Sequence, residues 1–395
     1  MNVLISGAGI AGPTLAFWLE KYGFAPTLVE SVPALRTSGY VIDFWGLGYD
    51  IAEKMGLLPD IVLIGYHMQE LRIVDDCGWR LSGFGVQVFR ELTGGRYITL
   101  GRSDLSKLIY DRISGSCEIL FGDSITSLRE AHGAVYVEFE NGSERCFDLI
   151  IGADGLHSCV RKLVFGAQDR YEKDLGYRVA AFETTGYRPR DELVYIIHGA
   201  PGRQVGRFTL HNDRTLFLFI FDGGAEAAAH DIEAQKKILR KAFEGDGWEL
   251  PRILDALDAC NDLYFDRVSQ IRMDAWARGR VALVGDAAFC VSLLAGQGSS
   301  LAMTAAYILA GELATSPNWP QEAFRRYEER LRPFIHAKQQ AAERFAAAFV
   351  PKTRLGVCLR NQVLKAFRVP AIAKIAIGRD IRDQLELPRY HCTAL

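Results

Sequence analysis

The stretch VLISGAGIAGPTLAF, residues 3–17, predicts a buried strand, a glycine turn and a helix in immediate succession. Gly7 allows a tight turn, Gly9 lets the backbone approach a pyrophosphate, and Gly12 lets the helix pack closely on the strand. Pro13 falls in the first helical turn, where its missing N–H costs no hydrogen bond. Because free amide groups at the start of a helix attract phosphate, the stretch predicts a nucleotide-binding turn.

An acidic residue follows the next predicted strand. Thr27 to Val29 form that strand and lead into Glu30, at about the distance a carboxylate needs to accept hydrogen bonds from a ribose. Glu30 therefore favours a dinucleotide, either FAD or NAD, as the ligand of this turn. A secretory leader is the alternative interpretation of this apolar N-terminus, but no Lys or Arg precedes Lys21, and glycines interrupt the apolar run. We therefore expect no leader.

The composition predicts a globular protein with a small-molecule partner. The chain has 395 residues, enough for two or more domains, and its 46 basic and 48 acidic side chains give a net charge of −2. This balance favours neither nucleic acid nor an anionic membrane as a partner. No apolar run reaches the length of a membrane span, so we expect no stable membrane insertion. We expect reduced thiols in the cytoplasm and a monomer or homodimer. The eight cysteines show no C-x-x-C spacing, so no metal site or disulfide framework is expected.

A second turn of similar character follows the apolar run at residues 147–152. Asp154 and Ser158 lie where a helix would start, and their side chains can satisfy backbone donors there. A capped junction between strand and helix is one interpretation of this segment. The other is a ligand site, because Asp154 and Arg161 would stand near the carboxyl end of a parallel strand, where open α/β sheets bind ligands.

A third turn lies nearly three hundred residues from the first. The apolar run at residues 281–284 leads into Gly285 and Asp286, and a glycine loop at 296–298 precedes a helix predicted to run through Leu313. Ser299 or Ser300 is the expected cap of that helix. The positive end of a helix starting there would favour an anionic ring held by the loop.

The three turns together resemble the fingerprints of the single-component, class A flavoprotein monooxygenases, the aromatic hydroxylase family of para-hydroxybenzoate hydroxylase. The matching segments are GAGIAG with Glu30, ADGLHSCVR at 153–161, and GDAA with GQG at 285–298, and the resemblance covers about residues 1–335. Phe289 stands where the family commonly has His, and Leu293 where it has Pro. The aromatic residue and the segment at 306–313 resemble a branch with tetracycline-inactivating and antibiotic-pathway oxygenases.

The resemblance implies FAD as the cofactor and assigns residues to it. The first turn would hold the ADP half, Arg102 would lie close to the flavin, Asp286 would accept from the ribityl chain, and the segment starting at Asp154 would serve both the FAD pyrophosphate and NAD(P)H, a transient co-substrate. The implied cofactor residues are Gly7, Gly9, Ala11, Gly12, Glu30, Arg36, Arg102, Asp154, Gly155, Arg161, Gly285, Asp286, Gly296, Gln297, Gly298 and Ser299.

The fold implied is α/β, a Rossmann-like FAD-binding domain interleaved with an antiparallel-sheet substrate domain, plus C-terminal helices. Strand-like segments at Glu70–Val74, Leu193–His198 and Leu216–Phe221 belong to the second domain, where core packing is the expected role of the alternating phenylalanines. We assign 1–65, 101–175 and 273–315 to the FAD-binding domain, 66–100 and 176–272 to the substrate-binding domain, and 316–395 to a C-terminal helical segment. Glu322–Arg332 and Ile335–Phe349 carry its helical composition.

The family's chemistry implies the function. NAD(P)H would reduce FAD, O₂ would add at the flavin C4a, and the hydroperoxide would transfer oxygen to a phenolic or polycyclic aromatic molecule such as an antibiotic or polyketide. No catalytic base is identified, because a lone His on a strand, such as His198 or His211, is more often structural. Two alternatives stay open: an FAD-dependent reductase or dehydrogenase without oxygen insertion, and a non-catalytic flavoprotein.

The basic, amphipathic tail from Val350 to Ala376 admits two interpretations. Such a segment can lie on a membrane surface, or it can pack on its own protein. Because Pro370 divides it, an internal brace is favoured.

Overall fold

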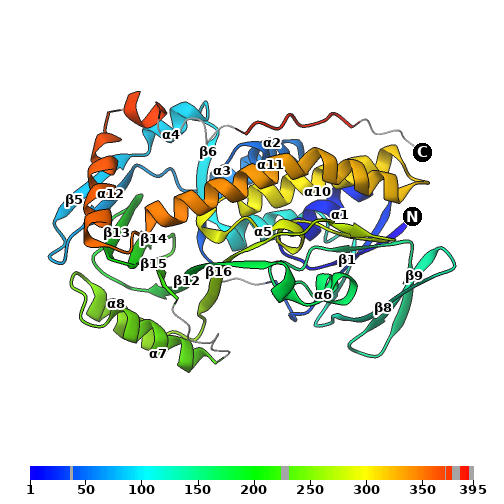
Figure 1. Ribbon diagram of the computed structural model, residues 1–395, viewed down its shortest axis with the longest axis horizontal. Coiled ribbons are helices and arrows are strands. Elements are labelled where there is room, and N and C mark those ends of the chain that lie inside the picture. The colour runs from blue at the N-terminus through cyan, green and yellow to red at the C-terminus, as the bar shows by residue number, and fades with distance from the viewer. Residues whose placement is uncertain (36–38, 224–230, 370, 376–382, 391–395) are drawn as a thin grey trace.

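The computed structural model describes the chain except for residues 36–38, 224–230, 370, 376–382 and 391–395. Two large sheets, joined by helices that pack along their faces, organise the molecule (Figure 1). In the part described, no helix combines the length and apolar character that crossing a bilayer requires. The seven cysteines described carry free thiols.

The six-stranded sheet contains the predicted nucleotide-binding turn. Its strand order is β17-β18-β11-β1-β2-β7, and all neighbours pair in parallel except β17 with β18. Parallel strands end at the same edge, so turns far apart in sequence meet there. The strands are β1 (Asn2–Ser6), β2 (Ala25–Glu30), β7 (Glu118–Phe121), β11 (Leu149–Gly152), β17 (Ala277–Arg278) and β18 (Val281–Leu283).

Helices cover this sheet and form the largest core. α1 (Ala11–Lys21) packs against α10 (Gly298–Thr315), and α10 in turn packs against α11 (Pro320–Phe349), which crosses the molecule (Figure 1). Nearly every residue of α10 is buried, as expected for a helix that is apolar all round. α11 is one continuous helix, so the two helical segments predicted there are merged, and Pro333 lies inside it.

The seven-stranded sheet has the order β16-β12-β15-β14-β13-β4-β5 and is antiparallel except for β13 with β4. The side chains of β15 alternate: Phe217 and Phe219 pack against two helices on one face, whereas Leu216 packs on the other, which confirms the predicted core role. The strands are β4 (Glu70–Val74), β5 (Arg80–Gly85), β12 (Glu172–Thr185), β13 (Val194–Ala200), β14 (Arg203–Thr209), β15 (Arg214–Asp222) and β16 (Tyr264–Ile271).

Three helices lie in this region, where the sequence pattern predicts only strands and turns. α7 (Ile232–Phe243) and α8 (Leu250–Ala259) cover the phenylalanine face of the sheet, and α4 (Gln87–Leu92) lies beyond β5. β12 begins at Glu172, inside the range assigned to the FAD-binding domain, so the domain limits stay a prediction.

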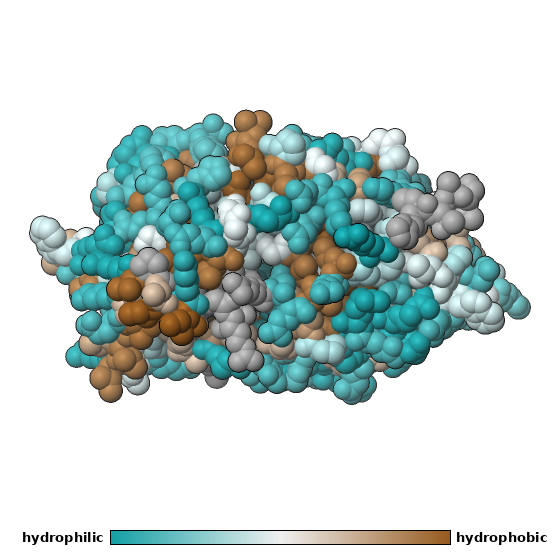
Figure 2. All heavy atoms as spheres, turned by 90° about the horizontal axis from the view of Figure 1, so that it is seen from above, coloured by the Kyte–Doolittle hydropathy of each residue, from teal (hydrophilic) through white to brown (hydrophobic). Residues whose placement is uncertain are grey.

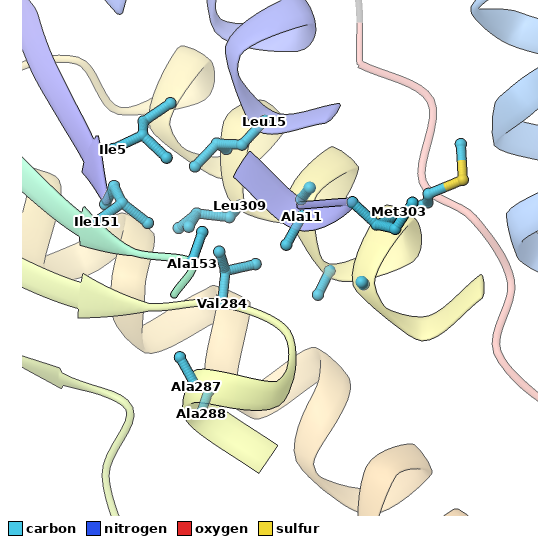
Figure 3. Close-up of a cluster of buried hydrophobic side chains, with 14 of the residues drawn as sticks. Ile5, Ala11, Leu15, Ile151, Ala153, Val284, Ala287, Ala288, Met303 and Leu309 are labelled. Atoms are coloured by element: carbon cyan, nitrogen blue, oxygen red, sulfur yellow. The ribbon is translucent and has the colours of Figure 1, made fainter. Parts of the chain in front are cut away.

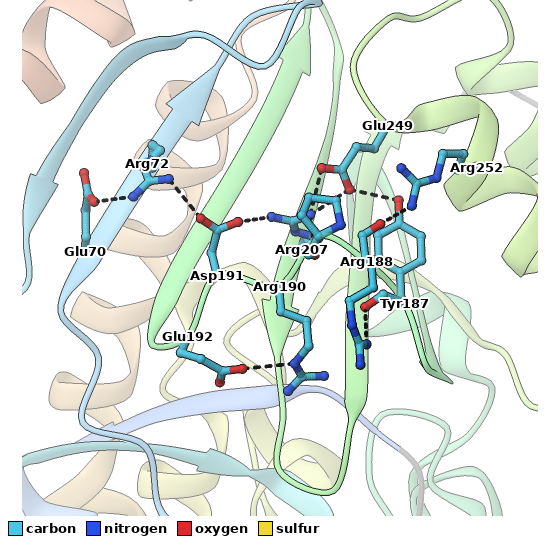
Figure 4. Close-up of polar contacts among 11 residues, drawn as sticks. Glu70, Arg72, Tyr187, Arg188, Arg190, Asp191, Glu192, Arg207, Glu249 and Arg252 are labelled. Carbon is cyan, nitrogen blue, oxygen red and sulfur yellow. Dashed lines mark hydrogen bonds and ion pairs between the residues drawn. The ribbon is translucent and has the colours of Figure 1, made fainter.

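An ion-pair network fastens α8 to the seven-stranded sheet. Arg207 of β14 is 3% exposed, pairs with Asp191 and donates from Nη1 to Glu249 Oε1 at 2.7 Å (Figure 4). Tyr187 Oη donates to the other oxygen of Glu249 at 2.9 Å. Because its donors are used within the protein, Arg207 has a structural role, and His198 likewise bonds to Asp76.

Smaller elements complete the fold. A two-stranded ribbon of β3 (Val41–Trp45) and β6 (Tyr97–Gly101) lies between the two large sheets, and a three-stranded sheet has the order β10-β9-β8. The remaining elements are α2 (Leu47–Lys54), α3 (Leu58–Ile64), α5 (Arg102–Asp111), α6 (Cys159–Phe165), α9 (Asp286–Phe289), α12 (Arg354–Ala366), β8 (Ile125–Ala131), β9 (Ala134–Phe139) and β10 (Glu144–Phe147). Two short 3₁₀ turns, Gln168–Arg170 and Leu293–Ala295, connect them.

α12 packs on β5 with one side and exposes apolar residues with the other. Ser82 Oγ donates to the Asn361 carbonyl at 2.6 Å, and Arg368 Nε donates to the Gly83 carbonyl at 3.1 Å. Apolar side chains gather at the α12 end of the molecule (Figure 2). The exposed ones include Leu355, Leu359 and Val363. The contacts with β5 agree with the predicted brace.

Candidate cofactor site

Main-chain hydrogen bonds tie the ends of the parallel strands to one another. Gly7 N donates to the Val29 carbonyl at 2.7 Å, Ala153 N to the Ser6 carbonyl at 2.8 Å, and Val284 N to the Gly152 carbonyl at 2.9 Å. The first, second and third predicted turns therefore lie side by side at one edge of the sheet. Figure 3 shows apolar side chains from the three turns and the helices that follow them, among them Ala11, Ala153 and Ala287, which belong to one buried core.

Two of the glycines permit this close approach. Gly7 has φ 107°, and a Cβ there would lie 2.6 Å from the Ala153 carbonyl oxygen. Gly285 has φ 66°, and a Cβ there would lie 3.2 Å from Ala11 Cβ. A side chain at Gly7 would force the first and second turns apart, and one at Gly285 would crowd the first against the third.

Gly9 and Gly12 differ in what surrounds them. A Cβ at Gly12 would lie 1.9 Å from the Gly7 carbonyl oxygen, so Gly12 is required for packing of the turn. Within the part of the chain that the structure describes, a Cβ at Gly9 would meet only Arg102 Nη2, at 3.8 Å. Because no intramolecular contact explains the glycine at position 9, the open space beside it fits the approach of a pyrophosphate. Among the described residues no side chain caps α1, so the amides that begin this helix remain available to an anion.

Glu30 lies beside this turn. Its Oε2 accepts from Ala8 N at 2.7 Å, and its Oε1 accepts from Val32 N at 3.2 Å. The carboxylate thus stands at the end of β2 next to the glycines, where a ribose hydroxyl can donate to it.

Arg102 and Asp286 bring opposite charges to the site. Arg102 begins α5, and its main-chain N donates to the Tyr40 carbonyl at 3.0 Å. Asp286 begins α9, and burial raises its pKa while the positive charge of Arg102 acts in the opposite sense. A Cβ at Gly298 would lie 3.9 Å from Asp286 Oδ1, so the glycine loop lies beside this acid. A half-buried carboxylate near an arginine is suited to accept from ligand hydroxyls.

Asp154 and Ser158 cap α6 as predicted. Asp154 Oδ2 accepts from Val160 N at 3.0 Å, and Ser158 Oγ accepts from Arg161 N at 2.9 Å while donating to Asp154 Oδ1. Burial raises the pKa of Asp154, and these hydrogen bonds partly offset that effect. No atom of the described residues lies within 4 Å of a Cβ placed at Gly155, so the turn is open on that side.

Arg161 connects two of the turns from below. Its side chain is 1% exposed and donates from Nη1 to the Ala287 carbonyl at 2.9 Å and from Nη2 to the Leu156 carbonyl at 2.6 Å. Arg161 therefore holds α9 against α6, and its contact with a cofactor stays a prediction.

The expected serine cap of α10 is wrong. Gln297 occupies the cap position, and its side chain makes no capping hydrogen bond. Ser299 is buried in the first turn, whereas Ser300 Oγ accepts from Gly48 N at 2.8 Å and donates to the Trp45 carbonyl at 3.3 Å. Ser300 therefore hydrogen-bonds to α2 and β3, which are distant in sequence and come close to it only in the folded chain. A Cβ placed at Gly296 would have none of the described atoms within 4 Å.

The two departures from the family pattern differ in their surroundings. Phe289 is 2% exposed, and its ring centroid lies 4.7 Å from that of Trp276 in the core. The Phe289 ring packs in the core, and this packing accommodates a phenylalanine at the position where the family commonly has histidine. Leu293 is half-buried in the 3₁₀ turn before Gly296. Arg36, the remaining predicted cofactor residue, lies outside the described residues.

Three residues that the sequence analysis did not select lie at the same place. The rings of Tyr40 and Tyr264 are 5.5 Å apart, and both tyrosines interact electrostatically with Arg102. Burial raises the pKa of each phenol. His157 Nε2 lies 3.2 Å from both oxygens of Asp266 on β16, and the hydrogen bond to Asp266 raises the pKa of this imidazole. Of these three residues, only His157 could have been selected from the sequence, because it lies within the second motif.

Strand ends that converge, an open glycine turn and an acid at a helix start define a dinucleotide-binding fold of the flavoprotein type. The chain belongs to the FAD-binding-domain family, which matches residues 1–342. A flavin-dependent monooxygenase from an unknown prokaryotic organism is 34% identical over 396 residues, 98% of this chain and 99% of that protein. A flavin-dependent monooxygenase from Legionella longbeachae is 30% identical over 401 residues, which cover 99% of this chain and 98% of that protein.

A solved structure is similar over the same length. The tetracycline destructase Tet(55) is 33% identical, covers 98% of both chains and has a TM-score of 0.84. These findings confirm the predicted fold, FAD as the cofactor and the class of enzyme: the protein is a flavin-dependent monooxygenase.

Proposed function

We propose that the protein hydroxylates a phenolic or polycyclic aromatic small molecule, such as an antibiotic or polyketide, with NAD(P)H as electron donor and O₂ as oxidant. The observation that carries the proposal is the convergence of the Gly9 turn, Arg102 and Asp286 beside the seven-stranded sheet. Full-length similarity to a tetracycline destructase supports a polycyclic substrate.

The three turns would hold FAD through those predicted residues whose side chains or open space face it. Gly9 leaves room for the pyrophosphate, Glu30 offers an acceptor for the ribose, and Asp286 offers one for the ribityl chain. Bound FAD supplies the redox chemistry, taking electrons from the nicotinamide and passing them to O₂.

The protein's own part is to orient the substrate and to exclude water. The seven-stranded sheet presents aromatic residues toward the β3–β6 ribbon, among them Tyr195, Phe208 and Tyr264. Planar side chains that are partly polar suit a flat ligand bearing hydroxyl groups. The seven-stranded sheet would thus form the substrate-binding domain.

Oxygen incorporation tests the proposal. We expect purified holoenzyme to oxidise NADPH or NADH faster when tetracycline or 1,8-dihydroxyanthraquinone is added, with O₂ consumed and a product 16 mass units heavier. Under ¹⁸O₂ the added mass should be 18. NAD(P)H oxidation that yields only peroxide or a reduced substrate would reject hydroxylation of these compounds and favour the reductase.

A further inference from the structure

One segment of the chain carries cations without any acid. Residues 351–375 contain six Lys or Arg side chains and no Asp or Glu, although the whole chain has a net charge of −2. Two of these cations, Lys352 and Lys374, pair with acids of other elements. In the described part of the chain, Arg354 and Lys365 are exposed and have no ion-pair partner. The charge balance of the whole chain therefore hides a local positive surface.

The same segment exposes a cluster of apolar side chains. Six of its large apolar residues are between 45% and 84% exposed. They form what we call the α12 patch: Leu355, Leu359, Val363, Val369, Ile372 and Ile375. Along the rest of the described chain, exposed side chains of this kind occur singly or in twos, such as Val62 and Leu63. Scattered exposed apolar residues are ordinary, whereas a cluster rimmed by charge marks a binding surface.

Helical geometry separates the two sides of α12. The patch residues of this helix are spaced by four, so they share one stripe along it. The other side contacts the protein: the ring of Phe367, just after α12, lies 5.7 Å from that of Phe84, and Arg360 Nη1 donates to Gln204 Oε1 at 3.1 Å. The helix is thus held in place with its apolar stripe turned outward. Because it is already ordered, a partner would bind it without the entropic cost of folding the segment.

The two unpaired cations lie on one side of the stripe. Arg354 and Lys365 are about three helical turns apart at about 3.6 residues per turn, so they project in the same direction from α12. Long basic side chains can lay their stems on apolar surface while their charged ends reach polar groups. At about 1.5 Å per residue the helix is about 20 Å long, shorter than the roughly 30 Å core of a bilayer. This layout suits a helix that lies in a membrane interface and does not cross it.

We propose that the α12 patch binds the surface of an anionic lipid bilayer, with the apolar stripe entering the acyl boundary and Arg354 and Lys365 contacting lipid phosphates. Charge favours this occupant over a second copy of the chain. A symmetric dimer would place the same six cations on both sides of the interface, where like charges repel. Anionic headgroups instead attract the cations, and acyl chains accept the apolar side chains. The inference stands apart from the proposed function, because it concerns where the enzyme lies and not what it oxidises.

Sedimentation with vesicles tests the inference on the full-length holoenzyme. We expect the wild type to bind vesicles of phosphatidylcholine with about one phosphatidylglycerol in three lipids at least about thirtyfold more tightly than vesicles of phosphatidylcholine alone. Salt at about 1 M should abolish this difference, because it screens charges that are more than about 3 Å apart.

Two double variants separate the apolar contribution from the charged one. Leu355→Glu/Leu359→Glu should weaken binding to both kinds of vesicle at least about tenfold, because the stripe can no longer enter the bilayer. Arg354→Gln/Lys365→Gln should weaken binding to the anionic vesicles about thirtyfold, roughly fivefold for each cation, and should leave binding to the neutral vesicles unchanged.

Matched controls change the same kinds of residue away from the α12 patch. Val62→Glu/Leu63→Glu alters an apolar pair of α3, which lies apart from α12 (Figure 1), and Leu63 is 81% exposed compared with 80% for Leu355. Lys54→Gln/Lys237→Gln removes two exposed cations, one from α2 and one from α7. Both controls should bind vesicles as the wild type does. Unchanged FAD content and melting temperature in every variant establish that folding is intact.

Three results would overturn the inference: a wild type that stays in the supernatant with both kinds of vesicle, equal binding to neutral and anionic vesicles, or control variants that lose as much binding as the patch variants. A fourth result would assign the α12 patch to a second copy of the chain instead. In that case light scattering would show a concentration-dependent dimer that Leu355→Glu/Leu359→Glu dissociates, and the wild type would not bind vesicles.

Discussion

At the scale of single residues, two glycines three positions apart in one turn serve different purposes. Gly12 is needed by the fold, because a methyl group there would overlap the Gly7 carbonyl oxygen. Gly9 is not needed by the fold, because a methyl group there would enter open space beside Arg102. The consensus spacing predicts both glycines, and only the structure separates the one that packs from the one that leaves room.

This difference predicts opposite results for two substitutions. Gly9→Val should give apoprotein with a melting temperature close to that of the wild type but with FAD affinity reduced at least tenfold, about 1.4 kcal/mol, since the side chain occupies the pyrophosphate's space. Gly12→Ala should lower the melting temperature of the apoprotein itself. Flavin absorbance after gel filtration and thermal scans without FAD measure both effects. A Gly9→Val protein with full flavin content would refute the assigned turn.

At the scale of elements, Arg161 shows how one helix positions another. Its guanidinium satisfies the carbonyls of Leu156 and Ala287, so α6 is fastened to α9, the helix that begins with Asp286. A buried carbonyl that loses its donor costs about 1–3 kcal/mol.

We expect Arg161→Met to destabilise the protein by about 3 kcal/mol, because the buried Ala287 carbonyl and the partly buried Leu156 carbonyl both lose their donor. FAD retention should fall with it, since α9 carries the acid proposed for the ribityl chain. Lys162→Met is the control: Lys162 lies next to Arg161 on α6 but is exposed, and a surface change there should stay within about 0.5 kcal/mol. Thermal scans and flavin content report both quantities. Identical behaviour of the two variants would contradict the role assigned to Arg161.

Sequence reasoning succeeded where the signal is local. The strand and helix around Gly7, the cap at Ser158 and the strand Glu70–Val74 each depend on neighbouring residues, and all three are found as predicted. It failed for Ser300, whose partners at Trp45 and Gly48 lie about 250 residues away. The contact of Arg161 with the Ala287 carbonyl is long-range for the same reason, because only the folded chain brings the two residues together.

At the scale of the whole molecule, the C-terminal segment 383–390 fastens three helices. Asp383 Oδ2 accepts from Leu47 N at 2.9 Å at the start of α2, and its Oδ1 lies 2.8 Å from Lys338 Nζ of α11. Tyr390 Oη donates to Glu312 of α10 at 2.7 Å. Since α2 also bonds to Ser300 beside the glycine loop, this segment is connected to the cofactor site through α2.

Asp383→Ala should therefore affect both stability and cofactor binding. The side chains of Asp383 and Lys338 are only 11% and 10% exposed, and a hydrogen bond between charged groups contributes about 1.5–3 kcal/mol, so the loss of this contact should lower stability by a similar amount. The start of α2 also loses its acceptor, so Ser300 and the glycine loop should be held less firmly and FAD should dissociate faster. Glu386→Ala, an exposed residue of the same segment, should change neither quantity. Melting temperature and the FAD dissociation rate distinguish the two variants. If Asp383→Ala releases FAD at the wild-type rate while melting at a lower temperature, the segment stabilises the helices without reaching the cofactor site.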